Sequence, residues 1–155
     1  MKKWICGLLT GALFLSVCMG CTQPEPKKEP SFPAELTVQK LLDSGAFSET
    51  LEELDPMLLF PLRGSAEDYN GSVLYYSTGA TAETVAVITS ADEELLAAAE
   101  ETLRLWLDYQ IESEKSYRPA EAQKLERAIL EKRGFSILLV VAADWDKAAA
   151  AIPAE

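Results

Sequence analysis

Residues 83–112 decide the fold, and they read ETVAVITSADEELLAAAEETLRLWLDYQIE. The first part, residues 83–89, is rich in β-branched side chains in alternation, which predicts a strand with one face buried more deeply than the other. The segment Ser90–Glu93 fits a capping box, in which the serine hydroxyl meets the backbone N–H of Glu93 and the glutamate reaches back. An apolar stripe at helical spacing follows, formed by Leu96, Ala99, Leu103, Trp106 and Leu107. We therefore predict a strand that leads into one long capped helix, which ends near Glu112.

The residues before this stretch predict a second strand and three short helical segments. Residues 69–77 (YNGSVLYYS) form an antiparallel hairpin with residues 83–89 in this interpretation, because turn residues separate two runs of β-forming residues. Residues 36–42 have their apolar side chains at helical spacing, and Ser48–Leu54 is expected to add another helical turn. Asp55-Pro56 is typical of an N-cap followed by proline at the first helical position.

The residues after the long helix predict a helix, a strand and a final short helix. Pro119 begins the helix, and Lys132-Arg133-Gly134 is expected to close it with cations and a glycine. Its inward-facing residues are expected to be Ala122, Leu125, Ala128 and Ile129. Residues 135–142 (FSILLVVA) are almost wholly apolar, which favours a strand covered on both faces and able to pair with either hairpin strand. Asp144 is expected to cap a last helix that runs through Ile152.

Together these elements predict one α+β domain over residues 36–155. A small, mostly antiparallel three-stranded sheet is expected to be covered by helices, one of them long and capped. The length of 155 residues suits a single domain, and the composition of 48% hydrophobic and 25% charged residues is ordinary for a globular protein.

The N-terminal residues have the features of an export signal. Met1-Lys2-Lys3 is a positive start, and Trp4–Val17 is an apolar run too short to span a bilayer comfortably. Gly20-Cys21 then resembles the lipoprotein signal box, in which a small residue precedes the cysteine. The resemblance implies that residues 1–20 are a signal peptide and that Cys21 carries a diacylglyceryl thioether, which holds the protein on a membrane. An uncleaved anchor helix and a secretory signal without lipid are the alternatives.

Residues 21–35 are interpreted as a spacer between the lipid and the domain. The stretch TQPEPKKEPSFPAE, which follows Cys21, is polar and rich in proline, so it is expected to stay extended. The domain is then expected to lie on the outer face of the cytoplasmic membrane, lifted off an anionic lipid surface that would repel it.

Charge and composition exclude several classes of function. The chain has 25 acidic and 14 basic side chains, a formal net charge of −11, so nucleic acid is not an expected partner. It has no histidine, and its three cysteines, Cys6, Cys18 and Cys21, all lie in the predicted signal or at its end. The domain therefore lacks the commonest general base, the commonest zinc ligand and any thiol or disulfide chemistry.

The stretch from Tyr69 to Ile152 resembles a known family of bacterial lipoproteins. The matching features are Glu83-Thr84-Val85-Ala86-Val87 with the helix after it, Tyr117-x-Pro119, and Lys132-Arg133-Gly134-Phe135 before an apolar strand that ends near Asp144. The family is common in Firmicutes and is known as domain of unknown function 4358. The resemblance implies a lipid-bearing cysteine and brings no established activity, cofactor or metal.

Few residues stand out as candidates for chemistry. Trp145 and Tyr117 are the two candidate binding residues, as an aromatic platform and as part of an aromatic surface, although both also suit packing or turn roles. Asp144-Trp145-Asp146 could supply oxygen ligands to calcium, but the EF-hand spacing is absent and a helix cap explains the pair more simply. No catalytic residue, cofactor or metal site is predicted.

These observations favour a non-catalytic module that binds an envelope protein or a small ligand. The oligomeric state is left open. The alternative is a small cell-envelope hydrolase that uses two carboxylates, at least one of them with a raised pKa. A calcium-stabilised module is a third possibility.

Overall fold

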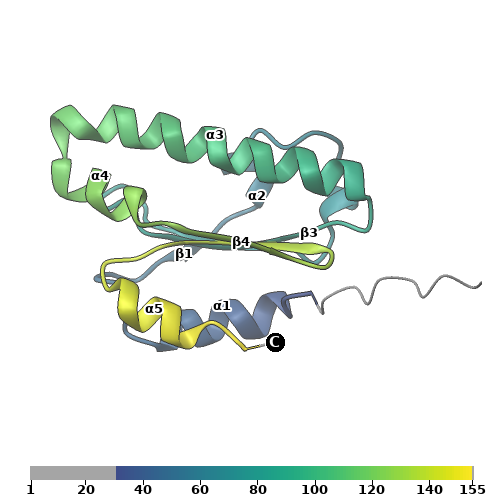
Figure 1. The fold of residues 1–155 in the computed structure, drawn as a ribbon, viewed down its shortest axis with the longest axis horizontal. Helices are drawn as coiled ribbons and strands as arrows, with labels where there is room; N and C mark the ends of the chain where they lie inside the picture. Colours follow the sequence, from purple (N-terminus) through teal and green to yellow (C-terminus); the bar gives the residue numbers. More distant parts are fainter. Residues whose placement is uncertain (1–30, 155) are drawn as a thin grey trace, which may run out of the picture.

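Five strands form one antiparallel sheet in the order β1-β2-β3-β5-β4 in the computed structural model, which describes residues 31–154 (Figure 1). The strands are β1 (Glu52–Glu53), β2 (Val73–Tyr76), β3 (Thr84–Thr89), β4 (Ile129–Arg133) and β5 (Ser136–Val141). The expected mixture of helices, antiparallel strands and one long helix is confirmed, but the expected number of three strands is wrong. The signal peptide, Cys21 and residues 21–30 of the spacer lie outside the described residues.

Helices cover both faces of this sheet (Figure 1). One face packs against α3 (Glu93–Tyr117) and α4 (Pro119–Glu126), and the other against α1 (Ala34–Asp43) and α5 (Trp145–Ala151). The short α2 (Pro56–Leu59) and the 3-10 helix η1 (Ala66–Tyr69) lie in the connection from β1 to β2. None of the helices in residues 31–154 is long and apolar enough to cross a membrane.

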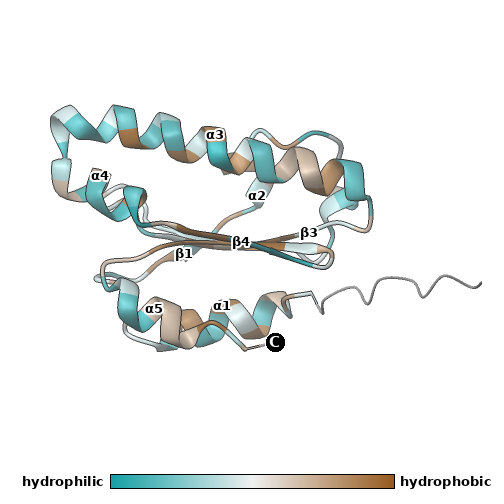
Figure 2. Ribbon diagram, in the orientation of Figure 1, coloured by the Kyte–Doolittle hydropathy of each residue, from teal (hydrophilic) through white to brown (hydrophobic). Residues whose placement is uncertain are grey.

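The core has two layers because successive side chains of a strand point to opposite faces. Ala86 and Ile88 of β3 pack on the α3 side, whereas Val85 and Val87 pack on the α1 side. All of β5 is buried, which confirms the strand covered on both faces, and its neighbour is β3. Figure 2 shows hydrophobic segments along the central strands, and hydrophobic and hydrophilic segments interspersed along α3.

The segment after α4 is a strand rather than the end of a helix, so the prediction for residues 127–133 is wrong. The helix ends at Glu126, and β4 pairs with β5 through Ile129↔Val140 and Leu130↔Leu139. Gly134, expected to end a helix, lies in the tight turn between the two strands with a φ of +50°. The apolar side chains of this segment point alternately to the two faces of the sheet. They pack in both core layers, which a strand allows and a continuing helix would not.

The segment from Ser48 to Leu54 also differs from the prediction, because it forms no helical turn. Its residues Glu52 and Glu53 form the edge strand β1 against Tyr76 and Tyr75, and the backbone N of Leu54 donates to Leu74 O at 3.0 Å. The open edge of β2 supplies hydrogen-bond partners that an isolated helical turn would lack.

The long helix begins later than the capping-box pattern predicted and extends beyond Glu112 to Tyr117. The N-cap is Asp92, whose carboxylate accepts hydrogen bonds from the backbone N of Glu94 at 2.8 Å and of Leu95 at 3.0 Å. The Ser90 hydroxyl instead accepts from the backbone N of Asp92 at 3.3 Å. An ionised carboxylate also interacts favourably with the positive end of the helix dipole. Asp92 rather than Ser90 is therefore the N-cap.

Other local predictions are confirmed. β2 and β3 form the expected hairpin, and Asp55 and Asp144 cap α2 and α5.

Phe32 is 3% exposed, and its backbone N donates to Ser136 Oγ at 2.7 Å. The chain therefore packs on the domain from Phe32 onward, inside the segment 21–35 that the sequence suggested is a spacer.

Candidate functional site

Several connections meet at the end of the sheet nearest α4, on the left in Figure 1. The loop before β1, the β2–β3 loop, α4 and the link from β5 to α5 are joined there by hydrogen bonds. Ala82 N donates to Glu121 Oε2 at 2.8 Å, and Asp144 N donates to Ala46 O at 2.9 Å. These bonds connect residues far apart in the sequence and build a polar cluster at one end of an otherwise apolar core.

The centre of this cluster is Glu83, whose side chain is fully buried. Its carboxylate accepts hydrogen bonds from the backbone N of Ser48 at 2.7 Å, from the Ser48 hydroxyl, and from Lys124 Nζ at 2.8 Å. Lys124 also pairs with Glu121 at 3.1 Å. The buried carboxylate therefore has a cation and two further donors, which offset the loss of hydration.

Lys124 and Ser48 are not arranged for nucleophilic catalysis. Burial lowers the pKa of Lys124, but its hydrogen bonds to Glu83 and Glu121 outweigh burial and raise the pKa above its ordinary value. Lys124 is therefore a charged ammonium with no lone pair to accept a proton. The Ser48 hydroxyl and Lys124 Nζ both donate to Oε1 of Glu83, so they do not hydrogen-bond to each other.

Glu49, which lies beside the cluster, has a lowered pKa and is therefore poorly suited to act as a general acid. Hydrogen bonds from the hydroxyls of Ser77 and Thr81 lower the pKa of Glu49, and burial opposes them only in part. Asp68, Glu114 and Asp144 also have lowered pKa values. Protonating a leaving group in glycoside hydrolysis requires the opposite shift, so these groups do not support the carboxylate hydrolase.

A cavity of about 170 Å³, here called the α3 pocket, lies beside the cluster between α3 and the β2–β3 loop. Four of its lining residues, Trp106, Gln110, Glu114 and Arg118, recur at a spacing of four along the helix and so share one face. Tyr76 of β2 also lines the pocket, and the remaining lining residues are Leu59, Ser77, Gly79, Thr81, Ala82, Thr84 and Leu125.

The charges of the α3 pocket neutralise each other. Arg118 Nε donates to Glu114 Oε2 at 2.6 Å, and the Arg118 NH2 group donates to Glu114 Oε1 at 2.5 Å. A further nitrogen of Arg118 donates to Gly79 O and Ala80 O, both at 3.2 Å. The hydrogen bonds from Arg118 lower the pKa of Glu114, although burial opposes them. Glu114 therefore stays ionised and paired with Arg118.

Three polar side chains of the α3 pocket are left without a partner. The hydroxyl of Tyr76, the indole N–H of Trp106 and the amide of Gln110 make no hydrogen bond to any residue within 31–154. By contrast, the hydroxyls of Ser77 and Thr81 are engaged by Glu49. The lining of the pocket therefore combines two aromatic side chains, two leucines and three side chains whose polar groups hydrogen-bond to no described residue, which is the usual make-up of a small-ligand site.

The two candidate binding residues from the sequence lie elsewhere. Trp145, 38% exposed, lines a separate cavity of about 240 Å³ with Lys124 and Arg127. The Arg127 guanidinium lies 5.4 Å from the centroid of the Trp145 ring, a cation–π contact. Tyr117 is the last residue of α3, is 87% exposed and does not line that cavity. A binding role for either residue stays a prediction.

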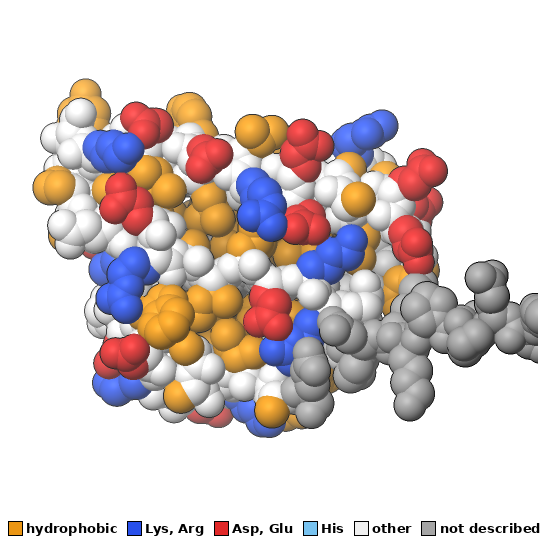
Figure 3. All heavy atoms as spheres, viewed as in Figure 1, with side chains coloured by type: hydrophobic (Ala, Val, Ile, Leu, Met, Phe, Trp, Pro, Cys, Tyr) orange, Lys and Arg blue, Asp and Glu red, His pale blue; other side chains and the backbone are white. Residues whose placement is uncertain are grey.

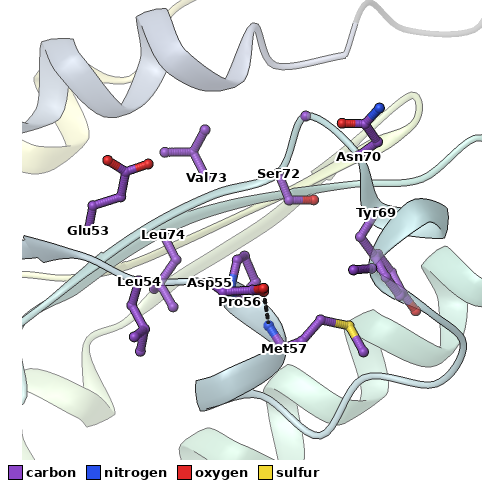
Figure 4. Close-up of a pocket in the computed structure, with 12 residues that line it drawn as sticks. Glu53, Leu54, Asp55, Pro56, Met57, Tyr69, Asn70, Ser72, Val73 and Leu74 are labelled. Carbon is purple, nitrogen blue, oxygen red and sulfur yellow. Dashed lines mark hydrogen bonds between the residues drawn. The ribbon is translucent and has the colours of Figure 1, made fainter.

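A larger depression, of about 480 Å³, lies at the sheet edge where β1 ends. Figure 4 shows that its side chains diverge: Glu53 and Val73 point to one side of the sheet, and Leu54 and Leu74 to the other. The carboxylate of Asp55 is directed at the backbone N of Met57, which it caps at 2.9 Å. No set of polar groups converges there, so this depression is a weaker candidate than the α3 pocket.

Figure 3 shows apolar side chains gathered between the α3 layer and the α1–α5 layer, with acidic and basic side chains interspersed over α3. Asp144, considered above for calcium, accepts from the backbone N of Lys147 and pairs with Lys147 Nζ, both at 3.1 Å. Residues 31–154 contain no group of three or more acidic, cysteine or histidine side chains placed to hold a metal ion.

The sequence reasoning missed the α3 pocket because it treated Trp106 as part of the apolar stripe. The spacing of Trp106, Gln110, Glu114 and Arg118 was a detectable signal on one helical face, but the sequence did not show which segment lies opposite it. A family model described as domain of unknown function (DUF4358) matches residues 65–142, which include Glu83, Lys124 and every lining residue of the pocket except Leu59. No significant match to a curated protein or to a solved structure was found.

Proposed function

The chain belongs to the family described as domain of unknown function (DUF4358), and on that premise we propose that it is a lipid-anchored, non-catalytic binding module on the outer face of the cytoplasmic membrane. The family supplies no activity, so the proposal depends on the residues of this chain. The observation that carries it is the α3 pocket, where three hydrogen-bonding groups are available while every nearby charge is already paired. Such a site can hold a ligand but offers no activated nucleophile or general acid.

The anchoring part of the proposal is supported by the sequence before the fold. Cys21 follows an apolar segment with a positive start, and prolines at 24, 26 and 30 separate it from Phe32, the first buried residue of the domain. A short proline-rich connection suits a domain with many acidic side chains, because it keeps them away from anionic headgroups. The partner on this surface is a small ligand or another envelope protein.

The anchor is tested with Cys21→Ala in cells that produce the full chain. The unmodified protein is expected in the membrane fraction at its processed size, whereas the variant is expected to keep its precursor size because the lipid acceptor is gone. Cys18→Ala is the matched control, since it removes a neighbouring thiol from the same segment and should be processed normally. Equal processing and equal membrane association of both variants would show that Cys21 is not the lipid site.

The non-catalytic part is tested separately. Purified full chain is incubated with cell-wall glycan fragments and with wall peptides, and the products are analysed by mass spectrometry. The expected result is that all substrates remain intact. Any fragment that appears with the protein and not with a heat-denatured sample would favour the hydrolase instead.

A further inference from the structure

We propose that the α3 pocket binds a single ring of a neutral sugar, held between Tyr76 and Trp106 and hydrogen-bonded by Gln110. This inference names the ligand class of the site described above and therefore rests on the proposed binding function. It is carried by the size of the pocket, by its charge balance and by the chemistry of its unpartnered groups.

The size of the pocket limits the ligand to about one ring. Its volume of about 170 Å³ is well below the roughly 300–1,000 Å³ of sites that hold drug-sized molecules. A volume of this size could not enclose a whole nucleotide or a folded peptide segment. A six-membered ring is compact enough to enter, and a longer chain of rings could extend from it into solvent.

The charge balance of the pocket disfavours ionic ligands. Glu114 and Arg118 form a bidentate pair, and Glu114 is only 9% exposed, so a charged ligand would have to break that pair and leave a buried charge unpaired. An anion would also approach a chain whose formal net charge is −11. A neutral ligand avoids both costs.

The unpartnered groups match a ligand that has hydroxyls around an apolar face. Tyr76 and Gln110 can each donate and accept, and the Trp106 indole can donate, which suits hydroxyl groups that do both. The aromatic rings and the Leu59 and Leu125 side chains supply apolar surface for the C–H face of a sugar ring. A purely apolar ring would leave the three polar groups unpaired on desolvation, which costs binding energy.

The groups are held by rigid elements before any ligand arrives. Trp106 and Gln110 lie one turn apart on the long helix α3, and the Trp106 ring packs edge-to-face on Phe60 with centroids 5.2 Å apart. Tyr76 lies in β2, between β1 and β3. Little conformational freedom is lost on binding, so even a small ligand can bind measurably.

The test is saturation-transfer NMR with the full chain in a detergent that has no sugar head group. The probes are methyl β-D-glucoside, its anionic counterpart methyl β-D-glucuronide, and the neutral capped amino acid N-acetylalanine methylamide. The glucoside is expected to bind with a Kd on the order of 1 mM, as befits a small ligand with few contacts. The glucuronide is expected to bind at least about fivefold more weakly, because its carboxylate has no free cation in the pocket.

Two variants locate the site. Tyr76→Phe removes only a hydroxyl, and Gln110→Ala removes the amide together with one methylene, so each should raise the Kd of the glucoside about fivefold, mainly through one lost hydrogen bond. Tyr75→Phe is the matched control, because its hydroxyl contacts Glu53 and its ring packs with the α1-side core. Unfolding midpoints measured in parallel show whether either variant changes stability, and Gln110→Ala keeps the test valid if Tyr76→Phe unfolds.

Three results would overturn the proposal: no saturation transfer to the glucoside, tighter binding of the glucuronide, or equal weakening by Tyr75→Phe. Binding of N-acetylalanine methylamide alone, weakened by Tyr76→Phe, would refute the sugar class while keeping the pocket as a binding site. No saturation transfer to any probe together with fragmentation of wall glycan in the mass-spectrometric assay would instead refute the binding module itself.

Discussion

Replacing Lys124 by methionine removes the cation that faces the buried Glu83 carboxylate. Methionine preserves most of the side-chain length, so the change mainly deletes a charge and its hydrogen bonds. The side chain of Glu83 is fully buried and that of Lys124 is 19% exposed, which makes this pair the most deeply buried ion pair in residues 31–154. Its loss leaves a buried carboxylate without a cation.

The structure sets the expected size of the effect. Breaking a buried ion pair costs about 3–5 kcal/mol of unfolding free energy. We expect about 3 kcal/mol, the lower end, because the backbone N–H and the hydroxyl of Ser48 still donate to Glu83. Glu83→Gln should cost less, about 1–2 kcal/mol, because Lys124 keeps Glu121 at 3.1 Å as a partner. Lys124→Met is therefore predicted to lower the unfolding free energy more than Glu83→Gln.

The measurement is equilibrium urea unfolding, followed by tryptophan fluorescence and far-UV circular dichroism. Lys40→Met is the matched control, because Lys40 is exposed on α1 and forms no ion pair within residues 31–154, so its replacement should change stability by less than about 0.5 kcal/mol. A Lys124→Met protein as stable as this control would refute the reasoning. So would a larger loss in Glu83→Gln than in Lys124→Met.

Two further predictions concern acid stability and a buried hydroxyl. Hydrogen bonds from Ser77 and Thr81 hold the pKa of Glu49 below its ordinary value of 4.5, so the stabilisation is present above that pH and is lost as the pH falls through the lowered pKa of the folded state. Urea unfolding at about pH 6 and about pH 3 should therefore show a smaller acid-induced loss in Glu49→Gln than in the unmodified protein, whereas Glu101→Gln, at an exposed position on α3, should behave like the unmodified protein. An identical loss in Glu49→Gln would contradict this. Thr37 is fully buried and its hydroxyl has no hydrogen-bond partner, so Thr37→Val should raise the unfolding free energy by about 1 kcal/mol. The same urea titration checks it, and a less stable variant would show that the hydroxyl is satisfied in solution.

Elements with a strong local pattern were predictable from the sequence. The strand at residues 136–141 is continuously apolar because helices cover both of its faces. The hairpin of β2 and β3 and the caps Asp55 and Asp144 depend on residues close together in the chain. In each of these cases the local preference and the tertiary packing favour the same structure, so the pattern is sufficient.

Residues 129–133 show where a local pattern was insufficient. Their apolar positions fit a helix that continues from α4 as well as a strand, and the glycine after them suits a helix end as well as a turn. Pairing with β5 decides between the two, because it places Leu130 beside Leu139 and Ile129 beside Val140. The edge strand β1 consists of two glutamates, which carry no strand signal without the neighbouring β2.

The sequence by itself determined the acidic charge, the absence of histidine, the candidate signal before Cys21 and the amphipathic long helix, because these are properties of composition and local order. Only the tertiary structure decided the pairing of Glu83 with Lys124 and the meeting of Tyr76 with Trp106 and Gln110. Glu83 and Lys124 are 41 residues apart in the chain. Contacts over such distances depend on how the helices close over the sheet, and one sequence contains no local signal for that arrangement.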